Sequence, residues 1–386
     1  MSQFDAITAE HLRAVGGVKW GLHPEAIGAF IAEMDFGVAE PITAALHQAV
    51  QLGAFGYLAP QPVRAMAEAY AGFAAGRYGW QIDPEDVHAL PDVLTGLGAA
   101  IRFLSRPDSP IIIPTPAYMP FLTIPQVYER PIIQVPMVEQ DGYYTYDLEA
   151  LDEAFAAGGH LLVLCNPHNP IGRVLTEQEM LDIAEVVDRH GGRVFADEIH
   201  APLVYPPHRH IPYASLNETT AGHTITATST SKAWNLPGLK AAQLILSNDH
   251  DRQTWRTAGP IAASGTANLG VIAATAAYRE GGPWLQEVLE YLDGNRHLLA
   301  ELLSEHLPGS RYTAPEGTYL GWVDLREVPL EQPPGAFFRR RAGVVVTDGS
   351  QCGDAGRGFI RYNFATPRPL LVEGISRLGQ AVADRV

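Results

Sequence analysis

The chain has 386 residues, enough for one large or two medium-sized domains, with an ordinary globular balance of 46% apolar and 18% charged residues. Its net charge of −16 argues against nucleic-acid binding through a basic surface. With only two cysteines, Cys165 and Cys352, the sequence predicts no disulfide framework. This favours a reducing compartment, which we expect to be the cytoplasm. Neither a signal peptide nor an apolar run near the ~18 residues of a membrane span is visible, so no membrane contact is expected.

The first quarter of the chain predicts an arm, a helix and a strand. Residues 1–50 have a sparse pattern typical of an arm. Apolar residues at helical spacing predict a helix from Pro62 to about Tyr78, and Val87–Leu90 predicts a strand. Pro91–Gly96 predicts the turn into a helix that continues through Leu104, and Val93 and Leu94 would contact a phosphate through their backbone. The first N–H groups of this helix lie at the positive end of the helix dipole, where a phosphate binds well.

The centre of the chain alternates strands with helices. Short apolar or β-branched runs predict buried strands at Pro110–Pro114, Leu161–Cys165, Arg193–Ala196 and Ile225–Thr228. Thr176-Glu177-Gln178-Glu179 is a capping-box pattern, which opens a helix between the second and third of these strands. This alternation predicts an α/β fold with a mostly parallel sheet.

Polar residues follow the ends of three of these strands: Asn169, Asp197 and Lys232. Ligands of open α/β sheets bind at the carboxyl ends of strands, so we expect these side chains to share a site. A lysine at such a strand end can be desolvated, which lowers its pKa and makes its amine a usable nucleophile.

A phosphate site next to this lysine suggests a Schiff base to pyridoxal phosphate (PLP). Ser229, Ser231 and Lys240 suit a phosphate, because hydroxyls donate hydrogen bonds and an ammonium neutralises charge. A carboxylate at Asp197 can keep the pyridine nitrogen protonated, and the Asn169 amide can donate to the phenolate oxygen of the ring.

His200, His208 and His210 lie within eleven residues and invite comparison with a zinc site. The region has three prolines and neither a helical pair of ligands nor a thiolate. We therefore predict no metal site, and assign His200 to the surroundings of the cofactor or to a structural role.

The C-terminal part predicts a smaller α+β domain. Residues 268–304 have a helical pattern that Gly281-Gly282-Pro283 interrupts. We place the domain boundary at this break. The large PLP-binding domain then covers 51–282 and the small domain 283–386, and the arm over 1–50 packs with the small domain.

Nine stretches carry a resemblance over nearly the whole chain: Ala32–Phe36, Phe55–Tyr57, Pro91–Leu97, Pro114–Phe121, Asn166–Arg173, Asp197–His200, Ser229–Lys232, Pro315–Tyr319 and Arg361–Ala365. With these motifs the chain resembles the fold-type I PLP-dependent enzymes. Within them it is similar to the cystathionine β-lyases of the MalY/PatB group, in the class I/II aminotransferase superfamily. Glu33 and Asp92 depart from the pattern, because the group more often shows Asp and Gly at these positions.

The resemblance also implies roles for residues that the strand pattern leaves open. Arg361 would bind the α-carboxylate of the substrate, with Asn169 and Tyr118 beside it. The Tyr118 ring would also stack on the pyridine ring. Tyr57 would reach the phosphate of the cofactor in a partner subunit, which implies a homodimer with active sites at the interface.

The implied function is a carbon–sulfur β-lyase that cleaves L-cystathionine and related S-substituted cysteines to a thiol, pyruvate and ammonia, in sulfur amino acid metabolism and methionine biosynthesis. Lys232 would bind PLP and remove the α-proton. An aminotransferase shares all of these residues and stays open, as does a PLP-fold protein with an added regulatory binding role. The lack of a clear second arginine motif argues against a dicarboxylate aminotransferase, and Arg339–Arg341 is assigned to surface ion pairs.

Overall fold

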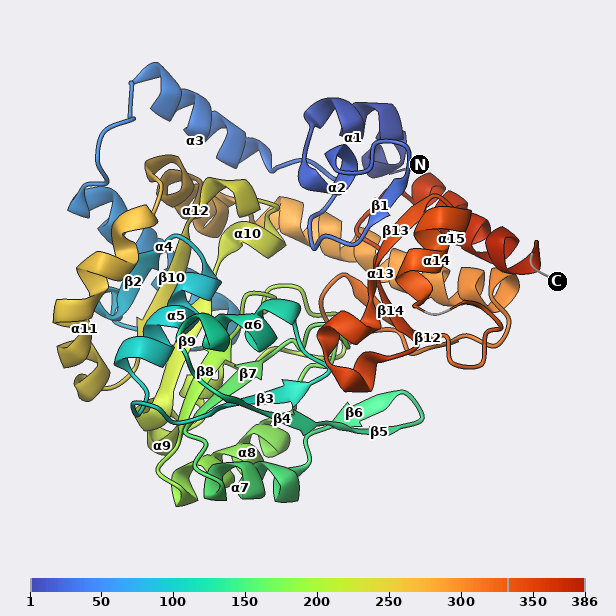
Figure 1. Ribbon diagram of the computed structural model, residues 1–386. Helices are drawn as coiled ribbons and strands as arrows, with labels where there is room; N and C mark the ends of the chain where they lie inside the picture. Colours follow the sequence, from blue (N-terminus) through green and yellow to red (C-terminus); the bar gives the residue numbers. More distant parts are fainter. Residues whose placement is uncertain (1, 332, 385–386) are drawn as a thin grey trace.

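The computed structural model describes residues 2–331 and 333–384 and contains two main sheets (Figure 1). The larger sheet has seven strands in the order β2-β10-β9-β8-β7-β3-β4. Their bounds are Val87–Leu90 (β2), Ile111–Thr115 (β3), Ile132–Pro136 (β4), Leu161–Cys165 (β7), Arg193–Asp197 (β8), Thr224–Thr228 (β9) and Ala242–Leu246 (β10). Strand β10 runs antiparallel to both neighbours, and the pairs from β9 to β4 are parallel.

Helices cover both faces of this sheet. All residues of β3, β7, β9 and β10 are buried, as expected for strands with no solvent-facing side. One face packs against α5 (Val93–Phe103) and α11 (Asp249–Ala262), and the other against α7 (Leu148–Ala156) and α8 (Glu177–Arg189). The capping box predicted at Thr176 is present at the start of α8.

The second sheet joins the two ends of the chain. Its five strands lie in the order β1-β13-β14-β12-β11, with bounds Ile27–Ala29 (β1), Arg311–Tyr312 (β11), Leu320–Asp324 (β12), Val344–Asp348 (β13) and Phe359–Asn363 (β14). Strand β1 pairs in parallel with β13, which places the N-terminal arm against the C-terminal part of the chain (Figure 1). A separate hairpin consists of β5 (Val138–Gln140) and β6 (Tyr143–Thr145).

The remaining helices are α1 (Ala9–Val15), α2 (Val18–Gly21), α3 (Glu40–Gln51), α4 (Pro60–Tyr78), α6 (Met119–Val127), α9 (Glu218–His223), α10 (Thr230–Ala233), α12 (Asn268–Glu280), α13 (Gly282–His306), α14 (Pro334–Arg341) and α15 (Arg368–Ala383). Among the described helices, none is long and apolar enough to cross a membrane alone. Within the described residues, the segments Asp249–Gly265 and Asn268–Glu280 pass such a test together, as one pair bent by 100°.

The predicted helix break is present between α12 and α13, and packing explains its position. The Trp234 indole donates a hydrogen bond to the carbonyl of Gly281 at 2.9 Å. A Cβ atom on Gly281 would collide with this indole ring and with the carbonyl of Ala277. Only glycine therefore fits at the junction of the two helices.

Candidate active site

Three of the predicted residues follow neighbouring strands of the large sheet. Strands β7, β8 and β9 are adjacent, and Asp197 at the end of β8 pairs in register with Cys165 and Ala227. Asn169 comes four residues after β7 and Lys232 four residues after β9. All three therefore lie along the carboxyl edge of the sheet, where open α/β sheets bind ligands.

Lys232 lies in the one-turn helix α10, directly after β9. Ser229 caps this helix, since its hydroxyl oxygen accepts a hydrogen bond from the Ser231 N–H at 3.0 Å and the hydroxyl donates to the carbonyl of Ala241 at 2.8 Å. Burial, assisted by the positive charge of Arg361, lowers the pKa of Lys232 to about 8. About a tenth of this side chain is therefore an uncharged amine at pH 7, far more than for an ordinary lysine, as nucleophilic or basic catalysis requires.

The arm supplies the acceptor for this amine. Lys232 Nζ donates a hydrogen bond to the carbonyl of Ala32 at 2.8 Å, and the Tyr319 hydroxyl donates to the same oxygen at 2.8 Å. The Asn363 amide donates to the two flanking carbonyls at 2.6 and 2.7 Å. The stretch around Ala32 is therefore fixed as one wall of the site, although it lies 200 residues from Lys232 in sequence.

A buried ion pair holds the same stretch from behind. Lys19 Nζ lies 2.8 Å from a carboxylate oxygen of Asp35, and each side chain is only 2% exposed. The Trp20 indole donates to the other carboxylate oxygen at 2.8 Å. Lys19 also donates to the carbonyls of Glu33 at 3.2 Å and Ala365 at 3.4 Å. These contacts satisfy both buried charges and tie the arm to the end of β14.

Asp197 is a buried carboxyl group without a basic partner. It accepts a hydrogen bond from the Ile199 N–H at 3.1 Å, and no basic side chain of the described residues lies within the 4.0 Å of an ion pair. Burial raises the pKa of Asp197 to about 7, although this N–H group and the charge of Lys232 oppose the shift. Such a carboxyl group is suited to bind a cationic ring nitrogen, whose charge would lower its pKa again.

His200, three residues after Asp197, has a ring nitrogen to offer. Its side chain is buried, and its Nδ1 atom has no hydrogen-bond partner within the described part of the chain. Burial lowers the pKa of His200 well below its usual value, so the imidazole is uncharged. The ring lies edge-on to Tyr319, with 5.7 Å between ring centroids. The Nδ1 atom of His200 is therefore available for a hydrogen bond to a bound molecule.

Arg361 and Asn169 meet, although 192 residues separate them. The guanidinium of Arg361 donates to Asn169 Oδ1 at 3.0 Å, to the carbonyl of Phe30 at 2.7 Å and to the hydroxyl of Thr347 at 3.1 Å. Arg361 is 2% exposed, and its Nε atom has no partner among the described residues. All three acceptors are neutral, so this buried cation is suited to bind an anion such as a carboxylate.

The N-terminus of α5 carries the second predicted anion site. Neither Val93 nor Leu94 donates its backbone N–H to another described residue. Asp92 caps the helix by accepting from the Thr95 N–H at 2.7 Å, and Lys240 pairs with the same carboxylate. The structure thus brings Lys240 to the start of α5. The Lys240 ammonium contacts Asp92, which stands where the resembled group more often has glycine.

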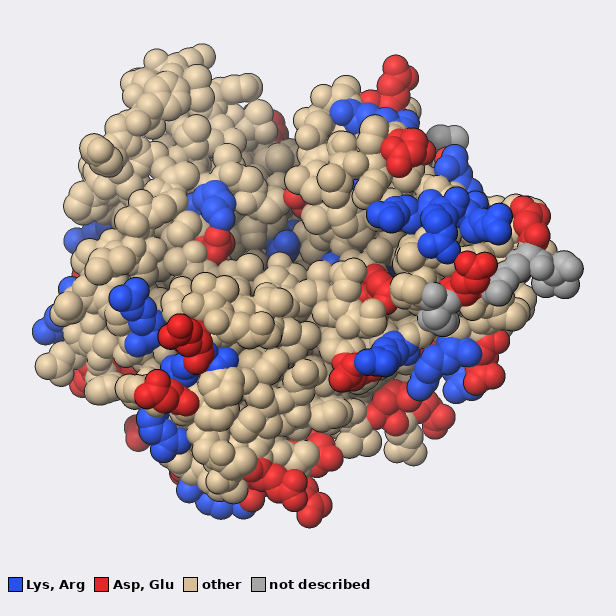
Figure 2. Space-filling view, in the orientation of Figure 1, with Lys and Arg blue, Asp and Glu red and all other residues tan. Residues whose placement is uncertain are grey.

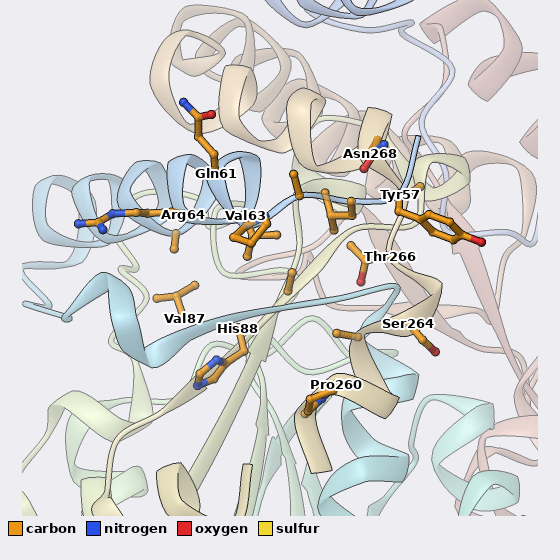
Figure 3. Close-up of a pocket in the computed structure, with 18 of the residues that line it drawn as sticks. Tyr57, Gln61, Val63, Arg64, Val87, His88, Pro260, Ser264, Thr266 and Asn268 are labelled. Carbon is orange, nitrogen blue, oxygen red and sulfur yellow. The ribbon is translucent and has the colours of Figure 1, made fainter. Parts of the chain in front are cut away.

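Tyr118 shares a cavity with the reactive groups, whereas Tyr57 does not. Tyr118, Lys232 and Arg361 line a cavity of about 490 Å³. Tyr57 is fully exposed and lines a separate groove of about 1560 Å³, together with Arg64, His88 and other residues. Figure 3 shows Tyr57 at one end of this groove, with its ring pointing away from the centre. The chain by itself therefore does not bring Tyr57 to Lys232.

Three acceptors in the site carry no signal of their own in the sequence: the carbonyls of Phe30 and Ala32 and the hydroxyl of Thr347. A backbone carbonyl has no side-chain signature, and Thr347 reads as an ordinary β-branched strand residue. The only available signal was that Ala32 begins one of the stretches that carry the family resemblance.

Comparisons with known proteins agree with this arrangement. The family model "Aminotransferase class I and II" matches residues 31–378. The chain is 38% identical to the cystathionine β-lyase of Corynebacterium glutamicum, covering 97% of this chain and 98% of that protein.

Two solved structures share the fold at 28% sequence identity. The PLP-bound C–S lyase of Staphylococcus hominis has a TM-score of 0.90 over 99% of this chain and 98% of that one. Cystalysin of Treponema denticola, which contains PLP, has a TM-score of 0.93 over the full length of both chains. With the family model matching most of its length, the chain belongs to the class I and II aminotransferase family.

Proposed function

We propose that this protein is a PLP-dependent carbon–sulfur β-lyase, which cleaves L-cystathionine and related S-substituted cysteines to a thiol, pyruvate and ammonia. One observation carries the proposal: Lys232, whose pKa is about 8, lines the same cavity as Arg361. Arg361 is buried and has no carboxylate partner among the described residues. The names of the similar proteins support the same reaction.

The residues of the site fit PLP. Asp197 would bind the pyridine nitrogen, Asn169 the phenolate oxygen and Lys232 the aldehyde carbon. The phosphate would bind the free N–H groups of Val93 and Leu94. The remaining proposed contacts come from Tyr118, which would stack on the ring, and from His200, Ser229, Ser231 and Lys240. Ser229 would approach the phosphate from α10, which it also caps.

In the proposed reaction, each of these groups has a task in binding or proton transfer. PLP, when bound, supplies an electron sink for the pair left on the substrate Cα. Arg361 would bind the α-carboxylate and so orient the Cα–H bond, with the neutral acceptors around it holding the guanidinium in place. Lys232 would take the α-proton at Nζ, and the Ala32 carbonyl would accept a hydrogen bond from the resulting ammonium.

The decisive experiment measures pyruvate, ammonia and free thiol released from L-cystathionine by PLP-loaded protein, beside Lys232→Ala. We expect equal amounts of pyruvate and thiol from the unmodified protein and none from the variant. Transfer of the amino group to a 2-oxo acid without pyruvate release would refute the lyase and establish the aminotransferase. The added regulatory role stays a sequence-based prediction.

We further propose a homodimer, in which the partner covers the groove that Tyr57 lines. Supporting it, Phe55 and Tyr57 line this groove and are both more than half exposed. Such large apolar side chains on one region favour a protein interface. Sedimentation of the unmodified protein tests the dimer. A Tyr57→Phe variant with an unchanged PLP affinity would contradict a role of its hydroxyl at the partner's phosphate.

The division into an arm (1–50), a large domain (51–282) and a small domain (283–386) also stays a proposal. It is supported by β1, which joins the sheet of the C-terminal part. We also propose a cytoplasmic location and a role in methionine biosynthesis, both from the sequence. The buried free thiols of Cys165 and Cys352 are compatible with a reducing compartment.

A further inference from the structure

The cavity that contains Lys232 and Arg361 has a second arginine. Arg339, in the last turn of α14, lines the same cavity of about 490 Å³. Its side chain is exposed, and no carboxylate of the described residues lies within ion-pair distance. Its neighbour Arg340 pairs with Glu331 at 3.1 Å. Arg340 therefore forms a surface ion pair as predicted, whereas Arg339 lines the cavity and has no carboxylate partner among the described residues.

The connection between the two arginines runs through β13 and the start of α14. Arg361 donates to Thr347, and the next residue, Asp348, accepts a hydrogen bond from the Gly335 N–H at 2.9 Å. Arg339 follows Gly335 by four residues, about one helical turn or ~6 Å along the axis. Arg361 is buried and Arg339 exposed, so the cavity has one guanidinium at its inner end and one at its mouth.

The wall between these ends suits an apolar linker. Phe30, Tyr118 and Met119 line the cavity with aromatic and thioether surface. Asp348 is an acidic residue on this wall, but its carboxylate already accepts hydrogen bonds from Gly335 and Ser350. Two guanidinium groups thus line one cavity in a chain of net charge −16, and Figure 2 shows basic side chains gathered near α14.

We propose that Arg339 binds a second carboxylate of the substrate, on the group attached to sulfur. The preferred substrates are then S-substituted cysteines whose substituent carries a distal carboxylate, as the homocysteine half of L-cystathionine does. This inference rests on the proposed function, because it requires a cysteine-derived substrate whose α-carboxylate lies at Arg361. It also supplies the second arginine that the sequence motifs did not reveal.

The test compares two substrates of similar length and opposite charge: S-(2-carboxyethyl)-L-cysteine and S-(2-aminoethyl)-L-cysteine. For Arg339→Gln we expect KM to rise about 10-fold for the carboxyethyl compound, the loss expected for one charged hydrogen bond. KM for the aminoethyl compound should stay constant or fall, and kcat should change little for both. Arg339→Lys should restore part of the preference, because an ammonium keeps the charge.

Arg340→Gln is the matched control, since it removes an adjacent arginine that pairs outside the cavity. An equal change of KM for both compounds, or the same effect from Arg340→Gln, would overturn the inference.

Calorimetric titration of PLP-loaded Lys232→Ala with the carboxyethyl compound provides a readout without turnover. Affinity should fall about 10-fold when Arg339→Gln is added. If no protein releases pyruvate but this difference is present, the lyase fails and the Arg339 contact stands. If pyruvate is released and affinity is equal, the Arg339 contact fails alone.

Discussion

Removing the carboxylate of Asp35 should destabilise the whole protein through the arm. In Asp35→Ala, the Lys19 ammonium stays 2% exposed but loses its partner at 2.8 Å, and the Trp20 indole loses its acceptor. Breaking a buried pair on one side costs about 3–5 kcal/mol. Lys19 keeps the carbonyls of Glu33 and Ala365 at 3.2 and 3.4 Å, so we expect the lower end, about 3 kcal/mol.

The assay is reversible urea unfolding of the PLP-loaded protein, followed by circular dichroism. Asp354→Ala is the matched control. Its pair with Arg357, at 2.7 Å, is equally short, but the two side chains are 76% and 83% exposed. This control should unfold at the same urea concentration as the unmodified protein, since exposed pairs contribute little. Equal destabilisation in the two variants would refute the argument that burial sets the cost.

A second variant separates charge from packing. The double change Lys19→Met and Asp35→Leu removes both charges and keeps apolar volume, so it should be more stable than Asp35→Ala. If the double variant is as unstable as Asp35→Ala, the unpaired ammonium is not the cause of the loss. Pyruvate release should recover with stability, because the arm then returns the Ala32 carbonyl to the site.

Two more predictions concern the site and one concerns the packing of β1. Burial raises the pKa of Asp197 to about 7, so the carboxyl group takes up a proton on folding between about pH 4 and 7. The cofactor-free protein should therefore lose stability as the pH rises through this range. In Asp197→Asn, the urea midpoint should no longer show this part of the pH dependence. The rate of Lys232 labelling by an amine reagent, followed by peptide mass spectrometry, should rise with pH with a midpoint near pH 8. Arg361→Met should move this midpoint to higher pH, because the charge of Arg361 lowers the pKa of Lys232. Gly28→Ala should abolish soluble folded protein in expression trials, because the new Cβ would collide with the carbonyl of Lys19.

The fold could be predicted from the sequence wherever a local signal was strong. The apolar runs at Val87–Leu90 and Leu161–Cys165 became β2 and β7 with the expected bounds. The arm was harder, because α1 and α2 are short and β1 has only three residues, too few to show a strand period. Pairing of β1 with β13 is a tertiary contact that no local pattern encodes.

The candidate site divides in the same way. Asn169, Asp197 and Lys232 were found because strand ends in a parallel sheet share an edge. The free guanidinium of Arg339 could not be found, since its run of three arginines looks like an ordinary solvated helix end. Only the packing of α14 against β13 shows which of the three faces the cavity.

The pairing of β1 with β13 has a consequence for biosynthesis. The hydrogen bond between Thr347 and Phe30 joins residues 317 positions apart, so the N-terminal arm leaves the ribosome long before its partner strand exists. Domains otherwise tend to fold in order of synthesis. Here the wall that contacts Lys232 can form only after β13 and β14 have been translated. A nascent chain therefore completes the site around Lys232 only after its last two strands have left the ribosome.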